Sequence, residues 1–239
     1  MDNQVLIKED IIIGQAGERA LKADLFLPPE SKSNSKAIVI VHGGGWREGS
    51  KDQLRGYGVL LSREGFVCLC AEYRLSQEEK WPAQIQDIKC AIRYIRANSD
   101  DLDINPSCIG VSGNSAGAHL CSMLISTDWR LYGLPNDCIK AATLISGIYD
   151  PEPTRWIKVN NEIGIDLDEA SLNNSMSLPP FVKCPVWLGA GGREPWPWID
   201  QTLDYSQYLR KNNFDPELHI LPNHNHFSIM DEIYKEDGI

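Results

Sequence analysis

The stretch IGVSGNSAGAHL, residues 109–120, decides the fold. A short apolar run ends at GNSAG, and apolar residues with helical spacing follow it. A G-x-S-x-G pentapeptide between a strand and a helix predicts a sharp turn, which needs small residues around the serine and strains its backbone. The turn lifts the Ser115 hydroxyl out of the sheet at the positive end of a helix. We therefore predict that Ser115 is a nucleophile.

A second glycine motif, HGGGW at residues 42–46, directly follows another run of β-forming residues. Three consecutive glycines lose much conformational entropy on folding, so something must come very close to this backbone. Attack by a serine on an acyl group creates an oxyanion, which is stabilised by preorganised N–H donors. We predict that Gly44, Gly45 and Ala116 supply these donors, with Gly43 as a further candidate.

Strand-like runs recur along the chain, and from the third onward most are separated by helix-like segments. The runs lie at residues 5–13, 21–26, 37–41, 66–71, 108–111, 139–145, 186–189 and 217–221, and helical spacing is clearest at 82–99, 116–126 and 200–212. This alternation predicts an α/β fold with a mostly parallel central sheet and helices on both faces. The first two strands should form an antiparallel hairpin at one edge. We expect one domain over residues 1–239, with a small lid-like insertion at about 150–183.

Composition restricts the class of protein. The chain has 239 residues, 42% of them hydrophobic, and a net charge of −10 without a basic cluster, which argues against a nucleic-acid partner. No basic segment followed by a long apolar segment opens the chain, and no apolar run is long enough for a membrane helix. We therefore expect a cytoplasmic location without membrane association. The seven cysteines are odd in number and lack metal-ligand spacing, so we expect reduced thiols, no metal site and no cofactor.

The two glycine motifs, together with YRLSQEEKWPAQIQDIKCAIRYIRAN at residues 73–98, resemble the α/β-hydrolase fold. More narrowly, they look like hormone-sensitive-lipase-like and feruloyl-esterase-like enzymes. The segments SGIYD at 146–150 and NHFSIM at 225–230 are similar to kynurenine formamidases. The resemblance covers residues 37–230. The sequence departs from these families at two positions. Asn114 stands where they commonly have an acidic or small residue, and Ala118 stands where they commonly have glycine.

A serine nucleophile needs a histidine base, and in this fold the histidine comes last in the chain. His42 and His119 lie too early, and His219 falls within the last predicted strand. The loop after that strand carries His224 and His226, and their spacing alone does not separate them.

We predict His226 as the base, since the loop must rise from Pro222 to reach Ser115, which favours the later residue. The resembling esterases and formamidases place a phenylalanine directly after the catalytic histidine, as Phe227 stands here. Phe227 can then anchor the base by packing at the start of a final helix. His224 would be a pocket or surface residue.

The histidine in turn needs a carboxylate that orients it. The loop GAGGREPW, residues 189–196, follows the seventh predicted strand and offers Glu194. Asp150, after the sixth strand, is the alternative, and Asp200 is a more distant one. Asp87 lies in the middle of an amphipathic helix, where we expect a structural hydrogen bond.

Four tryptophans and an asparagine are candidates for substrate contact. Trp46 follows the glycine loop and should form one wall of the pocket. Asn114 directly precedes the predicted nucleophile. Trp156, Trp196 and Trp198 fall in the insertion and the acid loop, where they can form an aromatic pocket.

These residues predict a serine hydrolase that cleaves small esters of short-chain or aromatic acids through an acyl-enzyme. The alternative is an arylformamidase of the kynurenine formamidase type, which uses the same machinery with an amine leaving group. A third hypothesis is a catalytically silent hydrolase fold that binds a ligand. The expected partner is a small-molecule ester, and the sequence leaves a homodimer open.

Overall fold

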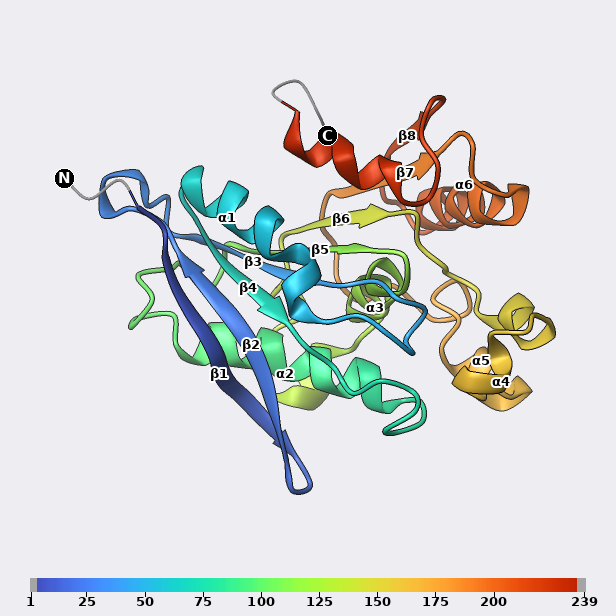
Figure 1. The fold of residues 1–239 in the computed structure, drawn as a ribbon, viewed down its shortest axis with the longest axis horizontal. Helices are drawn as coiled ribbons and strands as arrows, with labels where there is room; N and C mark the ends of the chain where they lie inside the picture. The colour runs from blue at the N-terminus through green and yellow to red at the C-terminus, as the bar shows by residue number, and fades with distance from the viewer. Residues whose placement is uncertain (1–3, 236–239) are drawn as a thin grey trace.

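One sheet of eight strands runs through residues 4–235, the part of the chain that the computed structural model describes (Figure 1). The strand order is β1-β2-β4-β3-β5-β6-β7-β8. The β1–β2 and β2–β4 pairs are antiparallel, and the other pairs are parallel. The strands are β1 (Leu6–Ala16), β2 (Arg19–Leu27), β3 (Lys36–Val41), β4 (Phe66–Ala71), β5 (Ile109–Asn114), β6 (Ala141–Ile145), β7 (Val186–Gly191) and β8 (Glu217–Leu221). The predicted fold class, including the antiparallel hairpin at the N-terminal edge, is confirmed.

Helices cover both faces of this sheet. The longer ones are α1 (Arg55–Arg63), α2 (Ala83–Ala97), α3 (Ala116–Ile125) and α6 (Trp196–Lys211). The shorter ones are α4 (Asn160–Ile163), α5 (Leu167–Leu172) and the 3₁₀ segments η1 (Glu30–Lys32), η2 (Lys51–Leu54), η3 (Trp129–Tyr132), η4 (Glu152–Trp156) and η5 (Ser228–Tyr234). Figure 1 shows α1 and α2 on opposite sides of the sheet. None of the helices in residues 4–235 is long and apolar enough to cross a membrane.

The central strands carry apolar side chains on both faces. In β4, Val67 and Leu69 join the large core under α2 and α3, whereas Cys68 and Cys70 join a second cluster that α1 covers. Burial on both faces is what a parallel strand between two helical layers requires. Asp87 of α2 is almost fully buried and binds the guanidinium of Arg74, so its expected structural hydrogen bond is present.

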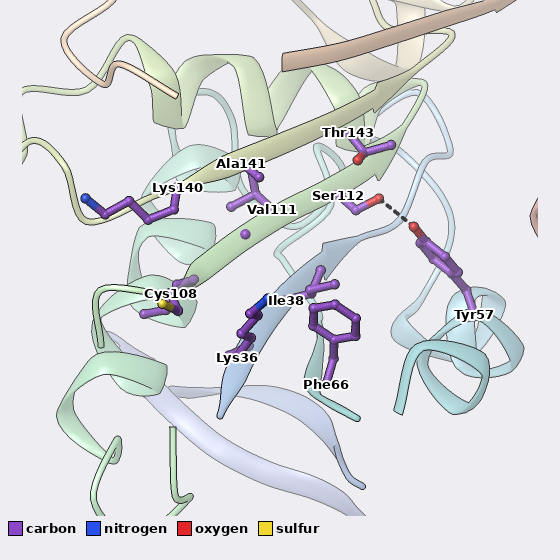
Figure 2. A pocket seen from close by; sticks show the side chains of 13 residues that line it. Lys36, Ile38, Tyr57, Phe66, Cys108, Val111, Ser112, Lys140, Ala141 and Thr143 are labelled. Carbon is purple, nitrogen blue, oxygen red and sulfur yellow. Dashed lines mark hydrogen bonds between the residues drawn. The ribbon is translucent and has the colours of Figure 1, made fainter. Parts of the chain in front are cut away.

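The face beneath α1 also has a groove of about 370 Å³ over strands β3, β5 and β6. The Tyr57 hydroxyl, from α1, lies 3.3 Å from the Ser112 hydroxyl. Figure 2 shows this contact at one end of the groove, with Phe66 beside the strands and Lys36 and Lys140 toward the other end. None of the predicted site residues lines this groove.

The segment between β6 and β7 has short helices only, η4, α4 and α5. Gly164 ends α4 in the left-handed region, and a capping box of Asp166 and Glu169 begins α5. The Val182 amide then donates to the Ile125 carbonyl at the end of α3, which ties the returning chain to the core.

The turn between β5 and α3 brings two backbones unusually close. A Cβ on Gly117 would lie 2.1 Å from the Val41 carbonyl oxygen, and one on Gly113 would lie 2.5 Å from the Gly117 carbonyl carbon. Both distances are far below van der Waals contact. Gly117 therefore allows α3 to pack directly against the end of β3, and Gly113 allows the tight turn from β5 into α3.

We expect Gly117→Ala to lower the free energy of unfolding by about 1–3 kcal/mol or more, because the new methyl group overlaps the β3 backbone. Gly110→Ala is the matched control, since its Cβ would meet nothing closer than 3.6 Å. Urea unfolding followed by fluorescence compares the two variants. Equal midpoints for both would contradict the steric role of Gly117.

Candidate active site

Ser115 lies at the junction of β5 and α3, as the pentapeptide predicts. Its backbone has φ 54° and ψ −121°, in a region that L-residues rarely adopt. The Ser115 amide donates to the Ile145 carbonyl at 2.8 Å, which fixes the turn against the end of β6. The side chain is largely buried but borders a cavity. The strain expected from the sequence is thus present at this residue.

His226 bridges Ser115 and Glu194. Its Nε2 lies 3.0 Å from the Ser115 Oγ, and its Nδ1 lies 2.7 Å from the Glu194 Oε2. An ionised carboxylate only accepts hydrogen bonds, so the Nδ1 carries a proton and the Nε2 of the neutral ring is left to accept one. The structure therefore brings together the three side chains predicted from the sequence, from the ends of β5, β7 and β8.

The Glu194 carboxylate is buried, with three donors around it. Besides the His226 ring, the Ser146 hydroxyl donates to Oε1 at 2.5 Å and the Gly191 amide at 2.7 Å. Burial alone raises the pKa of Glu194, but the hydrogen bonds from His226, Ser146 and Gly191 outweigh it and hold the pKa below its usual value. Glu194 is therefore ionised at neutral pH.

The other histidines are engaged elsewhere. His224 has its Nδ1 2.9 Å from the Ser228 carbonyl and its Nε2 2.7 Å from the Glu232 carboxylate. His42 stacks on Tyr73 and its Nδ1 lies 2.7 Å from the Gly43 carbonyl, and burial lowers the pKa of His42 to about 4.

His119 is fully buried within α3, with its Nε2 2.8 Å from the Asn173 carbonyl. His219 lies on β8, where its ring is hydrogen-bonded to the Glu217 carboxylate and stacks on Trp187.

The alternative acids lie away from the His226 ring. The carboxylate of Asp150 accepts the amide of Glu152 at 3.0 Å, and Asp200 is exposed on α6. Of the three candidate acids, Glu194 is the one whose carboxylate contacts His226, the predicted base.

The glycine loop passes directly over the nucleophile. A Cβ on Gly43 would lie 2.9 Å from the Asn114 Nδ2 and 3.2 Å from the Ser115 Cβ. Gly44 has φ 110°, and a Cβ there would lie 1.9 Å from the Glu48 carbonyl oxygen. A side chain at position 43 would therefore crowd Asn114 and Ser115, and one at position 44 would overlap the backbone of the loop itself.

The predicted oxyanion donors remain available. Within residues 4–235, the amides of Gly44, Gly45 and Ala116 donate to no backbone carbonyl. The Gly44 carbonyl instead accepts the amides of Arg47 and Glu48, which closes the loop into a tight turn. The Gly44 carbonyl therefore holds the loop, while in the described part of the chain the amides of Gly44 and Gly45 have no backbone acceptor.

The cavity beside Ser115 measures about 650 Å³, within the range of small-molecule sites. The glycine loop, the elbow and the β6–β7 segment border it, with η2 and η5 opposite. Its lining residues are Gly43, Gly44, Gly45, Trp46, Arg47, Glu48, Gln53, Leu54, Asn114, Ser115, Ile148, Thr154, Ile157, Val159, Ile163, Trp198, His226, Phe227, Met230 and Tyr234. Among the described residues, no group of three or more His, Cys, Asp or Glu is placed to hold a metal ion.

Two predicted substrate contacts lie at the cavity, though differently than expected. Asn114 lines it, and its Oδ1 is buried without a hydrogen-bond partner in the described part of the chain. Trp46 also borders the cavity, but its ring is fully buried and packs edge-on against Trp81 and His119. Trp46 has a positive φ, 58°, and its ring is part of the main hydrophobic core next to the cavity.

Trp196 and Trp156, which were expected from the sequence at the substrate pocket, are not among the residues that line this cavity. Their side chains are 75% and 77% exposed. Trp198, the third tryptophan expected there, does line the cavity, with its ring edge-on to His226 at 5.9 Å. Side chains two positions apart on a helix point in nearly opposite directions, so only one of Trp196 and Trp198 can point at the site.

Phe227 packs against His226, as expected from the sequence, but it does so from an exposed position. Its side chain is 81% exposed, although its ring lies edge-on to His226 at the cavity. The sequence also left Ser146 and Arg47 unnoticed. The guanidinium of Arg47 lies 2.6 Å from the Glu162 carboxylate and so links the glycine loop to α4.

Comparisons with known proteins agree with this geometry. The BD-FAE family model matches residues 23–141. Kynurenine formamidase of Salmo salar is 26% identical over 90% of this chain and 74% of its own length. Esterase LipC of Mycobacterium tuberculosis is 37% identical over 47% of this chain and 29% of its own length. Among solved structures, a bacterial heroin esterase superposes with a TM-score of 0.79 at 22% identity, covering 98% of this chain and 80% of its own.

The fold and these matches define an α/β-hydrolase. Within that class, the chain resembles the BD-FAE family over residues 23–141, together with curated esterases and kynurenine formamidases, and it is a hydrolase of the carboxylesterase type.

We expect His226→Ala to lower kcat by about 10⁴-fold, because the serine would lose its base, while His224→Ala should stay within about tenfold of wild type. Steady-state kinetics on a chromogenic acetate ester measures both. A greater loss in His224→Ala would overturn the choice of base. If Asp150→Asn were far more damaging than Glu194→Gln, the choice of acid would be wrong.

We expect Gly45→Val to lower kcat by about 10²–10³-fold, since a β-branched residue at φ 58° displaces the N–H groups that face the oxyanion. Gly17→Val is the matched control, because Gly17 has φ 61° and equal free space in the remote β1–β2 turn. Circular dichroism confirms folding of both variants. An unchanged kcat in folded Gly45→Val would remove the loop from the mechanism.

Proposed function

We propose that this chain is a carboxylesterase that hydrolyses small esters of short-chain or aromatic acids through an acyl-enzyme. The observation that carries the proposal is the continuous hydrogen-bonded series Ser115–His226–Glu194 at the wall of an open cavity. The free N–H groups of the glycine loop lie beside the same serine.

The geometry supports a two-step mechanism. The Nε2 of His226 takes the proton of Ser115 as the Oγ attacks the ester carbonyl carbon. The resulting oxyanion is held by the amides of Gly44, Gly45 and Ala116, and Glu194 stabilises the imidazolium. His226 then gives its proton to the leaving alkoxide oxygen as the C–O bond breaks.

The second step uses the same residues with water as the nucleophile. His226 takes a proton from water as the water oxygen attacks the acyl carbon. The second oxyanion collapses, the bond to the Ser115 Oγ breaks, and His226 returns the proton to the serine. The acid leaves and the free enzyme is restored.

The shape of the site supports a small acyl group. An apolar side pocket of about 140 Å³ adjoins the cavity and shares Ile148, Ile157 and Trp198 with it. A pocket of this size suits a short chain or a single ring, so we expect acyl groups of about two to six carbons to be preferred.

The second candidate is an arylformamidase. The formamidase of Salmo salar matches 90% of this chain, whereas the LipC match covers 47%. Formyl is the smallest acyl group, so it fits the same site. In this reaction His226 would protonate an aromatic amine instead of an alkoxide.

Rates on p-nitrophenyl esters from acetate to laurate, with methyl ferulate and N-formylkynurenine beside them, test the proposal. We expect the highest kcat/KM at short chains, because the side pocket is small. Ser115→Ala is the matched control and should lose about 10⁴-fold or more.

Faster turnover of the twelve-carbon ester than of the four-carbon ester would overturn the size argument. Preferential cleavage of N-formylkynurenine would favour the formamidase. If an organophosphate labelled another serine while Ser115→Ala kept wild-type rates, the nucleophile would be wrong.

A further inference from the structure

Ser146 is a buried hydroxyl that the reaction steps above do not use. It follows β6, is 1% exposed and has φ 50°. Its amide donates to the Gly189 carbonyl at 2.7 Å, which attaches this residue to β7. Its hydroxyl donates to the Glu194 Oε1 at 2.5 Å.

Three neighbouring strand ends supply the donors to the Glu194 carboxylate. Ser146 follows β6, Gly191 ends β7, and His226 follows β8. Ser146 and Gly191 both donate to Oε1, and the His226 ring donates to Oε2. The two donors on Oε1 fix the plane of the carboxylate, so that Oε2 faces the ring.

The backbone at Ser146 is costly for any residue with a Cβ. Serine in the left-handed region is uncommon, and glycine would adopt φ 50° without steric strain. Stability of the turn alone therefore favours glycine. The hydroxyl, with its one acceptor on Glu194, is what serine adds at this position.

We infer that Ser146 is a positioning residue, which acts through Glu194 on His226. The inference rests on the proposed function, because it requires Ser115, His226 and Glu194 to act as a catalytic set. Ser146 orients the carboxylate and disperses its charge, and it touches neither substrate nor the reacting atoms.

This role has a consequence for pH dependence. Without the Ser146 donor, the negative charge on Glu194 is less dispersed, so the carboxylate is more basic and holds the His226 Nδ1 proton more strongly. The imidazolium becomes more stable, and the acid limb of kcat/KM moves to higher pH. Tyr149 is also titratable and lies near Glu194, and burial raises the pKa of Tyr149, so it stays neutral across this range.

Ser146→Gly is the sharpest test, since it removes the hydroxyl while relaxing the backbone. We expect kcat to fall by about tenfold or more, the factor for losing a hydrogen bond to a charged group, with KM little changed. The acid limb of the kcat/KM profile should move to higher pH by about half a unit. Ser35→Gly is the matched control, because Ser35 also has a positive φ, 55°, and lies far from the site at the start of β3.

The same change in a Glu194→Gln background separates positioning from structure. If Ser146 acts through the Glu194 charge, Ser146→Gly causes little further loss there, because the two effects are coupled. A loss of the same size in both backgrounds, or a rate loss without movement of the acid limb, would overturn the inference.

The outcomes also distinguish this inference from the proposed function. Wild-type kinetics in Ser146→Gly, with Glu194→Gln strongly impaired, would reject the role of Ser146 and leave the catalytic set standing. Wild-type kinetics in Glu194→Gln would reject the catalytic set, and the role of Ser146 with it.

Discussion

Helix α3 crosses the end of β3 at a distance that leaves no room for a side chain between them. Gly117 faces the Val41 carbonyl, and Gly43 faces Asn114 and Ser115 in the same crowded region. This contact fixes where the helix begins and holds Ser115 in a backbone conformation that a free chain would avoid. It also brings the loop after β3 over the nucleophile, so one steric constraint sets both the serine and the N–H donors.

The second constraint is electrostatic, and it lies on the other side of the serine. Glu194 is buried, and a buried charge needs hydrogen bonds to be stable. The parallel order of β6, β7 and β8 brings three strand ends side by side, and each contributes a donor to this carboxylate. A base oriented by such a group loses little entropy when it reacts, since its ring is already in place.

Much of the fold and of the site could be predicted because the decisive signals are local. The strand, turn and helix around Ser115 lie within twelve consecutive residues, and the alternation of strands with helices is visible along the chain. The misses have a different origin. Whether Trp196 or Trp198 faces the cavity depends on the rotation of α6 about its axis, and tertiary packing sets that rotation. Ser146 could not be found because its partner lies 48 residues away and its positive φ leaves no sequence pattern.

An ion pair connects the glycine loop to the segment between β6 and β7. Arg47 pairs with Glu162 of α4, while the carbonyl of Gly44, three residues earlier, anchors the turn that presents the free N–H groups. Val159 and Ile163, on either side of Glu162, line the cavity. The ion pair therefore connects one wall of the cavity to the turn that carries the predicted oxyanion donors.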